Sequence, residues 1–357
     1  MKIRIAICTS DEQYSEKIVN YFMVHYYDKF TWNIFTESSY LTDFLKENNV
    51  DIVLVGKEME EQLKTVADND KSESIWVYLT DDEEEEIQSA GHKLEKYVRA
   101  DKIYRELLEL YSGKPNAQYR KGAIVNNKTD IYAVVSAAGG VGASTIACAM
   151  ARRFADFENV LYINMENIGA MPLVYSEEGK KGFDEVLFAL KSRKKALALK
   201  LASAVSRDKK GVYFLEESRN ALDVMELSFE DVKELLVALQ QMREYDKVIL
   251  DVGNGLGDKE IAAMTCAGRV IVVTQDNEVA QKKFSRYMEA LQLVEEHKNV
   301  DICSKMIVFF NKVLRQDRLP EKLCQVRTAG GFPRIENGTY EGIVSRIAGM
   351  EMLQNVN

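Results

Sequence analysis

The sequence predicts an α/β protein with two doubly wound, mainly parallel sheets, each forming its own domain. Its 357 residues correspond to about two domains at roughly 150 residues per domain. Hydrophobic residues make up 46% and charged residues 29% of the chain, an ordinary composition for packed globular domains. Short apolar runs alternate with amphipathic stretches, and strand–helix alternation is typical of parallel sheets covered by helices on both faces.

A turn-rich segment separates the two predicted domains. All four prolines lie at or after Pro115, and the segment Ser112–Asn116 is the clearest cluster of turn-forming residues near the first third of the chain. We therefore predict a first domain over residues 1–113, a polar linker over residues 114–129 and a second domain over residues 130–357.

The first domain contains five predicted strands with helices between them. The strands are expected at Ile3–Cys8, Phe30–Phe35, Asp51–Val55, Ile75–Leu79 and Lys96–Val98. The helices are expected at Tyr14–Tyr27, Tyr40–Glu47 and Lys102–Tyr111.

The acidic run Asp81–Glu86 follows the fourth strand. Because adjacent carboxylates repel one another, this run indicates a solvated loop, with a metal site as the weaker alternative.

This pattern resembles a response-regulator receiver domain, which has a flavodoxin-like fold. Receivers carry a phospho-accepting Asp directly after the third strand, and the matching residue here is Gly56. Thr80 stands where receivers have a switch Thr, the acidic cluster after the first strand is reduced to Asp11, and the basic residue after the fifth strand has no clear match. Without a carboxylate nucleophile no acyl phosphate forms. We therefore expect no phosphorylation site and a role in interaction or dimerisation; a small α/β domain of another kind is the alternative.

A strand, a glycine loop and a helix open the second domain. The strand is predicted at Ile131–Ser136 and the helix at Thr145–Phe154, with a glycine-rich segment between them. Such a unit presents backbone N–H groups and a helix N-terminus to an anion. Compared with the phosphate-binding pattern GxxxxGK[ST], Gly142 and Ser144 match, whereas Ala137 replaces the first Gly and Ala143 replaces the Lys. A glycine turn that only packs closely on a helix is the competing interpretation.

Polar residues follow several further predicted strands of this domain. The strands are expected at Val160–Ile163, Lys247–Leu250, Val270–Thr274 and Ile307–Phe310. They are followed by Asn164 and Glu166, by Asp251, and by Asn311-Lys312. Lys247–Asp251 resembles a Walker B strand that ends in its carboxylate. The apolar positions Leu235, Leu236, Leu239 and Met242 have helical spacing and predict a core-facing helix.

In this order the segments resemble the deviant-Walker ATPases of the MinD and ParA group. The form GGVGAST, joined to a receiver-like domain, resembles the TadZ/CpaE family of localisation proteins in tight-adherence (Flp) pilus assembly. The resemblance implies a MinD/ParA-like P-loop NTPase domain that binds ATP or ADP with Mg²⁺. The implied nucleotide-binding residues are Gly139, Gly140, Val141, Gly142, Ala143, Ser144, Thr145, Asn311, Lys312, Pro333, Arg334 and Ile335. The implied metal-binding residues are Ser144 and Asp251, and the implied catalytic residues are Asp251, Asn164 and Glu166.

Four departures from the family pattern weaken the implied catalysis. They are Ala138 for the signature Lys, Ala143 for the loop Lys, Asn164 for the first switch I Asp and Gly253 for the switch II Pro. A single trans Arg in related enzymes is worth about 10³–10⁵ in rate. Micromolar binding needs only about −8 kcal/mol, and charge-assisted backbone hydrogen bonds of about 1.5–3 kcal/mol each supply it. We therefore predict that ATP binding survives while hydrolysis is slow or absent.

The charge distribution gives no strong nucleic-acid signal. The 47 basic and 56 acidic residues leave a formal net charge of −9, so the chain as a whole repels polyanions. A basic patch between residues 191 and 210 contains Lys191, Arg193, Lys194, Lys195, Lys200, Arg207, Lys209 and Lys210. We interpret this patch as a solvated helix face, with contact to DNA or to an acidic partner as the alternative.

Cysteine usage and the C-terminal segment concern location. The five scattered cysteines without a CxxC pair indicate a reducing, cytoplasmic environment. Thr339–Asn357 lacks the basic amphipathic helix by which MinD-like proteins bind membranes, so no direct membrane anchor is expected. Recruitment to a cell pole or a membrane complex would then depend on a partner.

The leading hypothesis is an ATP-binding localisation or scaffold protein of pilus assembly that forms a homodimer and contacts pilus or secretion assembly proteins. The first alternative is an active MinD/ParA-type ATPase that cycles on DNA or membrane. The second alternative is a phosphorelay regulator.

Overall fold

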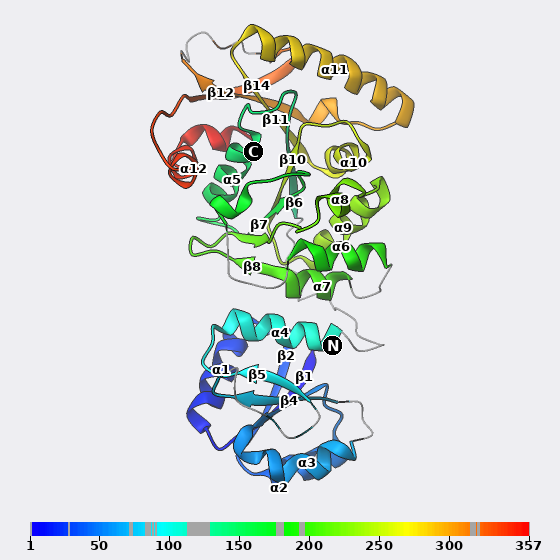
Figure 1. Ribbon diagram of the computed structural model, residues 1–357, viewed down its shortest axis with the longest axis vertical. Coiled ribbons are helices and arrows are strands. Elements are labelled where there is room, and N and C mark those ends of the chain that lie inside the picture. The colour runs from blue at the N-terminus through cyan, green and yellow to red at the C-terminus, as the bar shows by residue number, and fades with distance from the viewer. Residues whose placement is uncertain are drawn as a thin grey trace. The chain divides into compact units, whose positions relative to one another are not determined.

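The computed structural model describes residues 2–27, 29–70, 74–82, 87, 89, 91–112, 129–175, 182–192, 197–314, 319 and 322–356. Within these residues the strands form one five-stranded and one nine-stranded sheet, which we describe separately (Figure 1). Nearly all of the predicted linker, Glu83–Glu86 of the acidic run and Arg193–Lys195 of the basic patch lie outside the described residues.

The five-stranded sheet has the order β2-β1-β3-β4-β5, and every neighbouring pair is parallel. Its strands are β1 (Ile3–Cys8), β2 (Phe30–Phe35), β3 (Ile52–Gly56), β4 (Ile75–Thr80) and β5 (His92–Glu95). Its helices are α1 (Glu12–His25), α2 (Ser38–Glu47), α3 (Glu60–Asp68) and α4 (Ala100–Ser112). This strand order is that of flavodoxin-like folds, so the predicted fold class of the first domain is confirmed.

Helices pack on both faces of this sheet. Leu41 of α2 and Leu63 of α3 belong to a core cluster with β1, β3 and β4. On the opposite face, aromatic rings of α1 and α4 meet those of β2, with the Phe22 and Phe30 ring centroids 5.4 Å apart. Strand β3 is buried along its whole length, which explains its uninterrupted apolar sequence.

The prediction of a fifth strand at Lys96–Val98 is wrong. The strand is β5, which pairs with β4 in parallel from His92 to Glu95, and residues 96–98 form the turn that follows. The prediction followed the apolar Tyr97 and Val98, but Tyr97 has a φ of 60° and lies in the turn. Lys96 therefore comes directly after the fifth strand and is the basic residue for which the sequence showed no clear match.

The nine-stranded sheet has the order β13-β14-β12-β11-β6-β10-β7-β9-β8 and is parallel except at its two edge pairs. Its strands are β6 (Asp130–Ser136), β7 (Val160–Asn164), β8 (Val205–Arg207), β9 (Tyr213–Leu215), β10 (Lys247–Gly253), β11 (Arg269–Gln275), β12 (Met306–Val313), β13 (Lys322–Leu323) and β14 (Val326–Pro333). The predicted central strands are confirmed with bounds that differ by a few residues, whereas the edge strands were not predicted.

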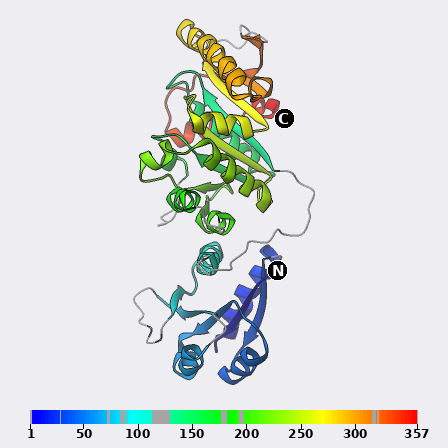
Figure 2. The same ribbon diagram turned by 90° about the vertical axis from the view of Figure 1, so that its right-hand side faces the viewer.

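The helices after residue 129 are α5 (Ala143–Phe154), α6 (Phe183–Lys191), α7 (Leu197–Ala204), α8 (Ala221–Met225), α9 (Phe229–Met242), α10 (Asp258–Cys266), α11 (Glu278–Lys298) and α12 (Tyr340–Ala348). Helices α5 and α12 cover one face of the sheet, and α9, α10 and α11 cover the other (Figures 1 and 2). The positions predicted to face the core on α9 are buried. Among the described helices, none is both long and apolar enough to cross a lipid bilayer.

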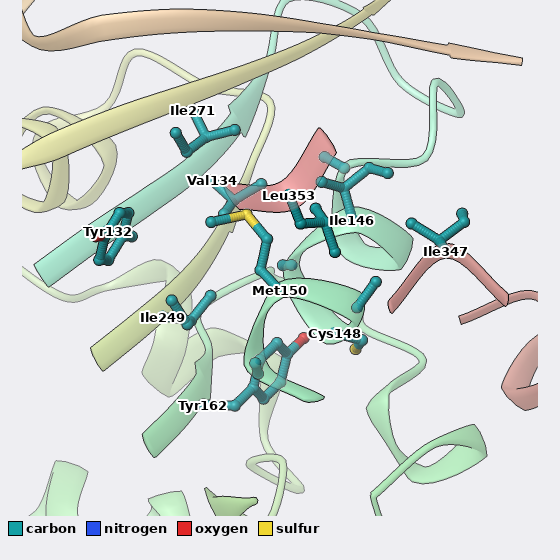
Figure 3. Packing of buried hydrophobic residues seen from close by; sticks show 14 of the residues in the cluster. Tyr132, Val134, Ile146, Cys148, Met150, Tyr162, Ile249, Ile271, Ile347 and Leu353 are labelled. Carbon is teal, nitrogen blue, oxygen red and sulfur yellow. The ribbon is translucent and has the colours of Figure 1, made fainter. Parts of the chain in front are cut away.

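Helix α5 lies at the centre of the larger core. Ile146, Cys148 and Met150 of this helix are almost completely buried against strands β6, β7, β10 and β11 (Figure 3). Ile347 of α12 lies on the other side of α5, and Leu353 belongs to the same core cluster, near Val134 and Ile146 (Figure 3). Burial on nearly all sides holds α5 firmly, and its N-terminus is therefore fixed at the edge of the sheet.

Candidate functional site

The predicted site residues lie at the carboxyl ends of parallel strands. Asn164 ends β7, Asp251 lies near the end of β10, Asn311 lies near the end of β12 and Pro333 ends β14. The chain passes from β6 outward to β7, and later crosses from β10 to β11 on the other side of β6. Ligands of such sheets bind at the carboxyl edge where the strand order reverses, which is where the loop after β6 lies.

The glycine loop ends in an uncapped helix N-terminus. Gly140 has a φ of 75° and Gly142 a φ of 98°, a left-handed backbone that glycine adopts readily. Gly142 is the N-cap of α5, and no side chain of the residues that the structure describes caps the helix. The first N–H groups of a helix have no intrahelical partner and carry the positive end of the helix dipole. The N–H groups of Ala143, Ser144 and Thr145 are therefore available to an anion outside the helix.

Two residues from β12 brace this loop. The Nδ2 atom of Asn311 donates a hydrogen bond to the carbonyl oxygen of Val141 at 2.8 Å, and the Nζ atom of Lys312 donates to that of Gly140, also at 2.8 Å. Asn311 is buried, and a Cβ atom on Gly142 would lie only 2.3 Å from its Nδ2 atom. Two of the implied nucleotide-binding residues, Asn311 and Lys312, thus fix the shape of the loop.

A buried carboxylate lies close to the first turn of α5. Asp251 is completely buried and accepts a hydrogen bond on Oδ2 from the Tyr162 hydroxyl at 2.8 Å. Its Oδ1 atom has no hydrogen-bond partner among the residues that the structure describes. The Ser144 hydroxyl interacts with this carboxylate and donates to Oε2 of Glu166 at 3.0 Å. An unpartnered carboxylate oxygen beside a hydroxyl fits the oxygen ligands that Mg²⁺ prefers.

The electrostatic balance of the site also favours a cation. Burial raises the pKa of Asp251 to about 8, and the charge of Glu166 adds to the shift. Burial likewise raises the pKa of Glu166, which the hydrogen bond from Ser144 partly offsets and the charge of Glu217 increases. A divalent cation would lower the pKa of these carboxyl groups and relieve their mutual repulsion.

Three residues of the site were missed in the sequence: Tyr162, Glu217 and Lys259. Lys259 is almost fully buried, and its Nζ atom donates to the carbonyl oxygen of Met165 at 2.7 Å and to Oδ1 of Asn167 at 2.6 Å. Glu217 follows strand β9 and accepts a hydrogen bond from Nδ2 of Asn164. The acidic pair Glu216-Glu217 directly after an apolar run was the available signal for Glu217, but β9 is a short strand that the sequence did not reveal.

The remaining predicted residues lie at the same edge. Val313 of β12 is in register with Pro333 of β14, and the Arg334 N–H donates to the Val313 carbonyl at 3.3 Å. A Cβ atom on Gly139 would make only an ordinary contact, 3.7 Å from Nδ2 of Asn254.

The backbone conformation at Gly253 accounts for the absence of the switch II proline of the family pattern. This residue has a φ of 82°, whereas the proline ring fixes φ near about −65°. A proline at position 253 is incompatible with this backbone, so the turn after β10 has its own conformation here.

The carboxyl edge of the five-stranded sheet holds a separate cluster. A Cβ atom on Gly56 would lie 2.4 Å from Oε1 of Glu58, so the Glu58 carboxylate fills the space beside the glycine. This Oε1 atom accepts hydrogen bonds from the Thr9 hydroxyl and the Ser10 N–H, each at 2.7 Å. Burial alone would raise the pKa of Glu58, but these hydrogen bonds outweigh it and lower that pKa. Lys96 pairs with Asp81 at 2.8 Å.

This arrangement predicts that the cluster is not phosphorylated. Incubation with a small phosphodonor such as acetyl phosphate is expected to leave the N-terminal part of the chain unlabelled, because no carboxylate extends from position 56 and Glu58 is held by its donors. Mass spectrometry of the intact chain and its fragments measures this. Glu58→Gln serves as the control: label present in the natural chain and absent in Glu58→Gln would make Glu58 an acceptor and support a phosphorelay regulator.

Three described members of the basic patch, Lys191, Arg207 and Lys210, have local partners. Lys191 forms ion pairs with Asp223 at 2.9 Å and Glu226 at 3.1 Å. Arg207 stacks over the ring of Tyr213, 5.0 Å from its centroid, and Lys210 pairs with Glu341 at 3.8 Å. These contacts favour the interpretation of a structural, solvated face.

Comparisons with known proteins agree with this geometry. Residues 1–112 match the family model described as the TadZ-like receiver domain, and residues 129–304 match the model of an AAA domain. No curated protein matches the chain.

Several solved structures are similar to the second part of the chain. A ParA family ATPase from Chlorobium tepidum TLS is 18% identical with a TM-score of 0.51, over 64% of this chain and 97% of that one. MinD from Pyrococcus horikoshii OT3, complexed with Mg-ADP, is 17% identical with a TM-score of 0.47, over 62% of this chain and 94% of that one. MinD in the MinC:MinD complex from Aquifex aeolicus is 15% identical with a TM-score of 0.49, over 64% and 94%.

At such identities the likeness to the Chlorobium protein establishes the fold, which is that of a ParA/MinD-like P-loop NTPase. The two family models add the identity and order of the domains. The order of the domains, a TadZ-like receiver domain followed by a domain with the ParA/MinD-like P-loop NTPase fold, matches the TadZ/CpaE-type architecture.

Proposed function

We propose that this protein binds ATP or ADP with Mg²⁺ and acts as a localisation or scaffold protein of tight-adherence (Flp) pilus assembly, with slow or absent ATP hydrolysis. One observation carries the nucleotide part of the proposal. An uncapped helix N-terminus after a left-handed glycine loop lies beside Asp251, a buried carboxylate with an unpartnered oxygen. The TadZ-like receiver model supports the pilus part.

Different groups of the chain would bind the phosphates, the metal ion and the base. Backbone N–H groups of residues 139–145 face the phosphates, and the Ser144 hydroxyl with the Asp251 carboxylate would hold Mg²⁺. When bound, Mg²⁺ neutralises phosphate charge. Asn311 and Lys312 would keep the loop in its present shape, and the segment Pro333–Ile335 would flank the base. Most of these groups are fixed before binding, so little conformational entropy is lost when the ligand arrives.

Slow turnover follows from the cations that are absent or already engaged. Ala138 and Ala143 provide no charge where related proteins have lysines, and both are buried. Lys312 is bonded to the loop carbonyl of Gly140, and Lys259 to the carbonyl of Met165. Phosphoryl transfer depends mainly on positioning and on stabilising negative charge, so a site in which the described lysines are already engaged is expected to bind better than it catalyses.

Calorimetry and a turnover assay test this proposal together. Titration of the full chain with ATP in excess Mg²⁺ is expected to give a micromolar Kd, corresponding to about −8 kcal/mol. Phosphate release is expected to be at least about 10³-fold slower than a typical turnover of about 10 s⁻¹. Absence of any heat from adenine nucleotides would remove the nucleotide part of the proposal. Robust turnover stimulated by DNA or lipid vesicles would support the cycling ATPase instead.

The proposal extends to assembly and location. We infer a cytoplasmic homodimer whose nucleotide state sets its conformation, recruited to a cell pole or membrane complex by pilus or secretion assembly proteins. Sedimentation of the same samples, with and without Mg-ATP, should show a dimer in at least one state, and a monomer in both would contradict it.

A further inference from the structure

Glu217 holds both ends of the segment that carries Glu166. Its Oε1 atom accepts a hydrogen bond from Nδ2 of Asn164, where β7 ends, and another from the Met171 N–H at 2.7 Å, where the segment ends. Between them Glu166 reaches the glycine loop through the Ser144 hydroxyl. One carboxylate oxygen thus closes a loop whose middle residue contacts the first turn of α5.

The pair explains why position 164 carries an amide. Asn164 is buried, and its Oδ1 atom accepts from the Glu166 N–H at 2.8 Å while its Nδ2 atom donates to Glu217. An aspartate at this position would keep the acceptor and lose the donor. It would also place two carboxylates in direct contact, so that one of them would have to bind a proton.

The segment of residues 165–171 packs closely against Asn164 and Glu217. A Cβ atom on Gly169 would lie 2.0 Å from Nδ2 of Asn164 and 2.3 Å from Oε1 of Glu217, so even a methyl group does not fit. The close approach means that the position of the segment, and hence of Glu166, depends on the hydrogen bond between Asn164 and Glu217.

We propose that Glu217 is a positioning residue of the nucleotide site: through Asn164 and the Met171 N–H it holds residues 165–171 so that Glu166 faces Ser144. The ligand of this site, Mg-nucleotide, rests on the proposed function. The contact between Glu217 and Asn164 does not depend on it. The carboxylate that is missing at position 164 is thus provided by Glu217, which follows β9. The amide of Asn164 is the hydrogen-bond donor that this carboxylate needs.

Chemical unfolding of the full chain without nucleotide tests the contact. Asn164→Asp alone is expected to raise the unfolding equilibrium constant by about tenfold or more, as coupled contacting residues do. In a Glu217→Gln background the same change should raise it by no more than about threefold. The reason is that the introduced glutamine carries no charge, so the introduced aspartate no longer faces a second carboxylate. Equal effects of Asn164→Asp in both backgrounds would overturn the pairing.

Nucleotide affinity with and without Mg²⁺ tests the positioning role. Glu217→Ala is expected to reduce the gain in ATP affinity that Mg²⁺ provides by about tenfold and to leave the Mg²⁺-free affinity unchanged. Glu217→Gln should retain that gain to within about threefold. Equal losses with and without Mg²⁺ would indicate only general destabilisation and overturn the role. If the natural chain binds no nucleotide, the proposed function fails, while the unfolding experiment still decides the pairing.

Discussion

Replacing Gly142 by Ala is expected to lower the affinity for Mg-ATP by about a hundredfold, equivalent to about 2.7 kcal/mol. An alanine at a φ of 98° is strained, and its Cβ atom would lie 2.3 Å from Nδ2 of Asn311. Left-handed backbone costs an alanine about 1–2 kcal/mol, and displacing Asn311 removes a buried hydrogen bond worth about 1–3 kcal/mol. Both effects disturb the loop that presents the N–H groups. Calorimetric titration of the variant measures the loss.

Two neighbouring glycines provide matched controls. Gly140→Ala adds a Cβ atom with nothing within 4 Å, so it isolates the cost of the φ of 75°. Gly139 has no positive φ and its Cβ atom would make an ordinary contact at 3.7 Å, so Gly139→Ala should lose the least affinity of the three variants. Affinity should fall in the order Gly139→Ala, Gly140→Ala, Gly142→Ala. Equal affinities for all three would show that the loop shape braced by Asn311 does not determine binding.

Binding of Mg-ATP at pH 7 is expected to release close to one proton from Asp251. With a pKa of about 8, this carboxyl group is about 90% protonated at pH 7, whereas a carboxylate that holds Mg²⁺ is ionised. Affinity should therefore rise about tenfold per pH unit as the pH approaches 8 and level off above it. Calorimetry in two buffers of different ionisation enthalpy counts the released protons. Asp251→Asn should lose both the proton release and the gain in affinity from Mg²⁺.

The ionisation of Asp251 affects the stability of the free protein in the opposite direction: affinity for Mg-ATP rises with pH, whereas stability falls. Its pKa is about 8 when folded and near about 3.9 when unfolded, so folding takes up a proton between these values. The associated stability is complete below the unfolded pKa and is lost as the pH rises through the folded pKa. Compared with the natural chain, Asp251→Asn should thus gain relative stability from pH 4 towards pH 8. Unchanged proton release in Asp251→Asn would assign the titrating group to another residue, such as Glu166.

The carboxylates at the carboxyl edges of the two sheets differ in their hydrogen-bond and ion-pair partners. In the larger domain, Asp251 keeps an unpartnered oxygen, whereas in the receiver-like domain the carboxylates of Glu58 and Asp81 are bonded to Thr9, Ser10 and Lys96. A carboxylate whose acceptors are already satisfied gains less from a cation or a phosphoryl group. This contrast supports the proposal that the ligand chemistry belongs to the larger domain.

The central strands of both sheets were predictable because their sequences carry the signal locally. Buried parallel strands appear as uninterrupted apolar runs, as in β3 and in Val270–Thr274 of β11. The fifth strand of the first domain was misplaced because β5 buries little more than Leu94, so its four residues have no such run. Pairing with β4, which no local pattern encodes, decides its position.

The candidate site divides in the same way. The order of Gly140, Gly142, Ser144 and Asp251 along the chain predicted a phosphate loop and a carboxylate, because these groups act at strand ends that the apolar runs locate. The contacts that shape the site join residues far apart in sequence. Asn311 bonds to a carbonyl 170 positions away, Asn164 to a carboxylate 53 positions away, and Thr9 to Glu58 over 49 positions.

By itself, therefore, the sequence determined the fold class, the strands of both sheet centres and the glycine loop with its Asp251. Only the tertiary structure decided that Glu58 fills the space beside Gly56, that Asn311 and Lys312 brace the loop, and that Glu217 is the partner of Asn164. The physical reason is range: backbone conformation and apolar periodicity are properties of neighbouring residues. The partner of a buried polar group is set by which distant strand ends meet at one edge of a sheet.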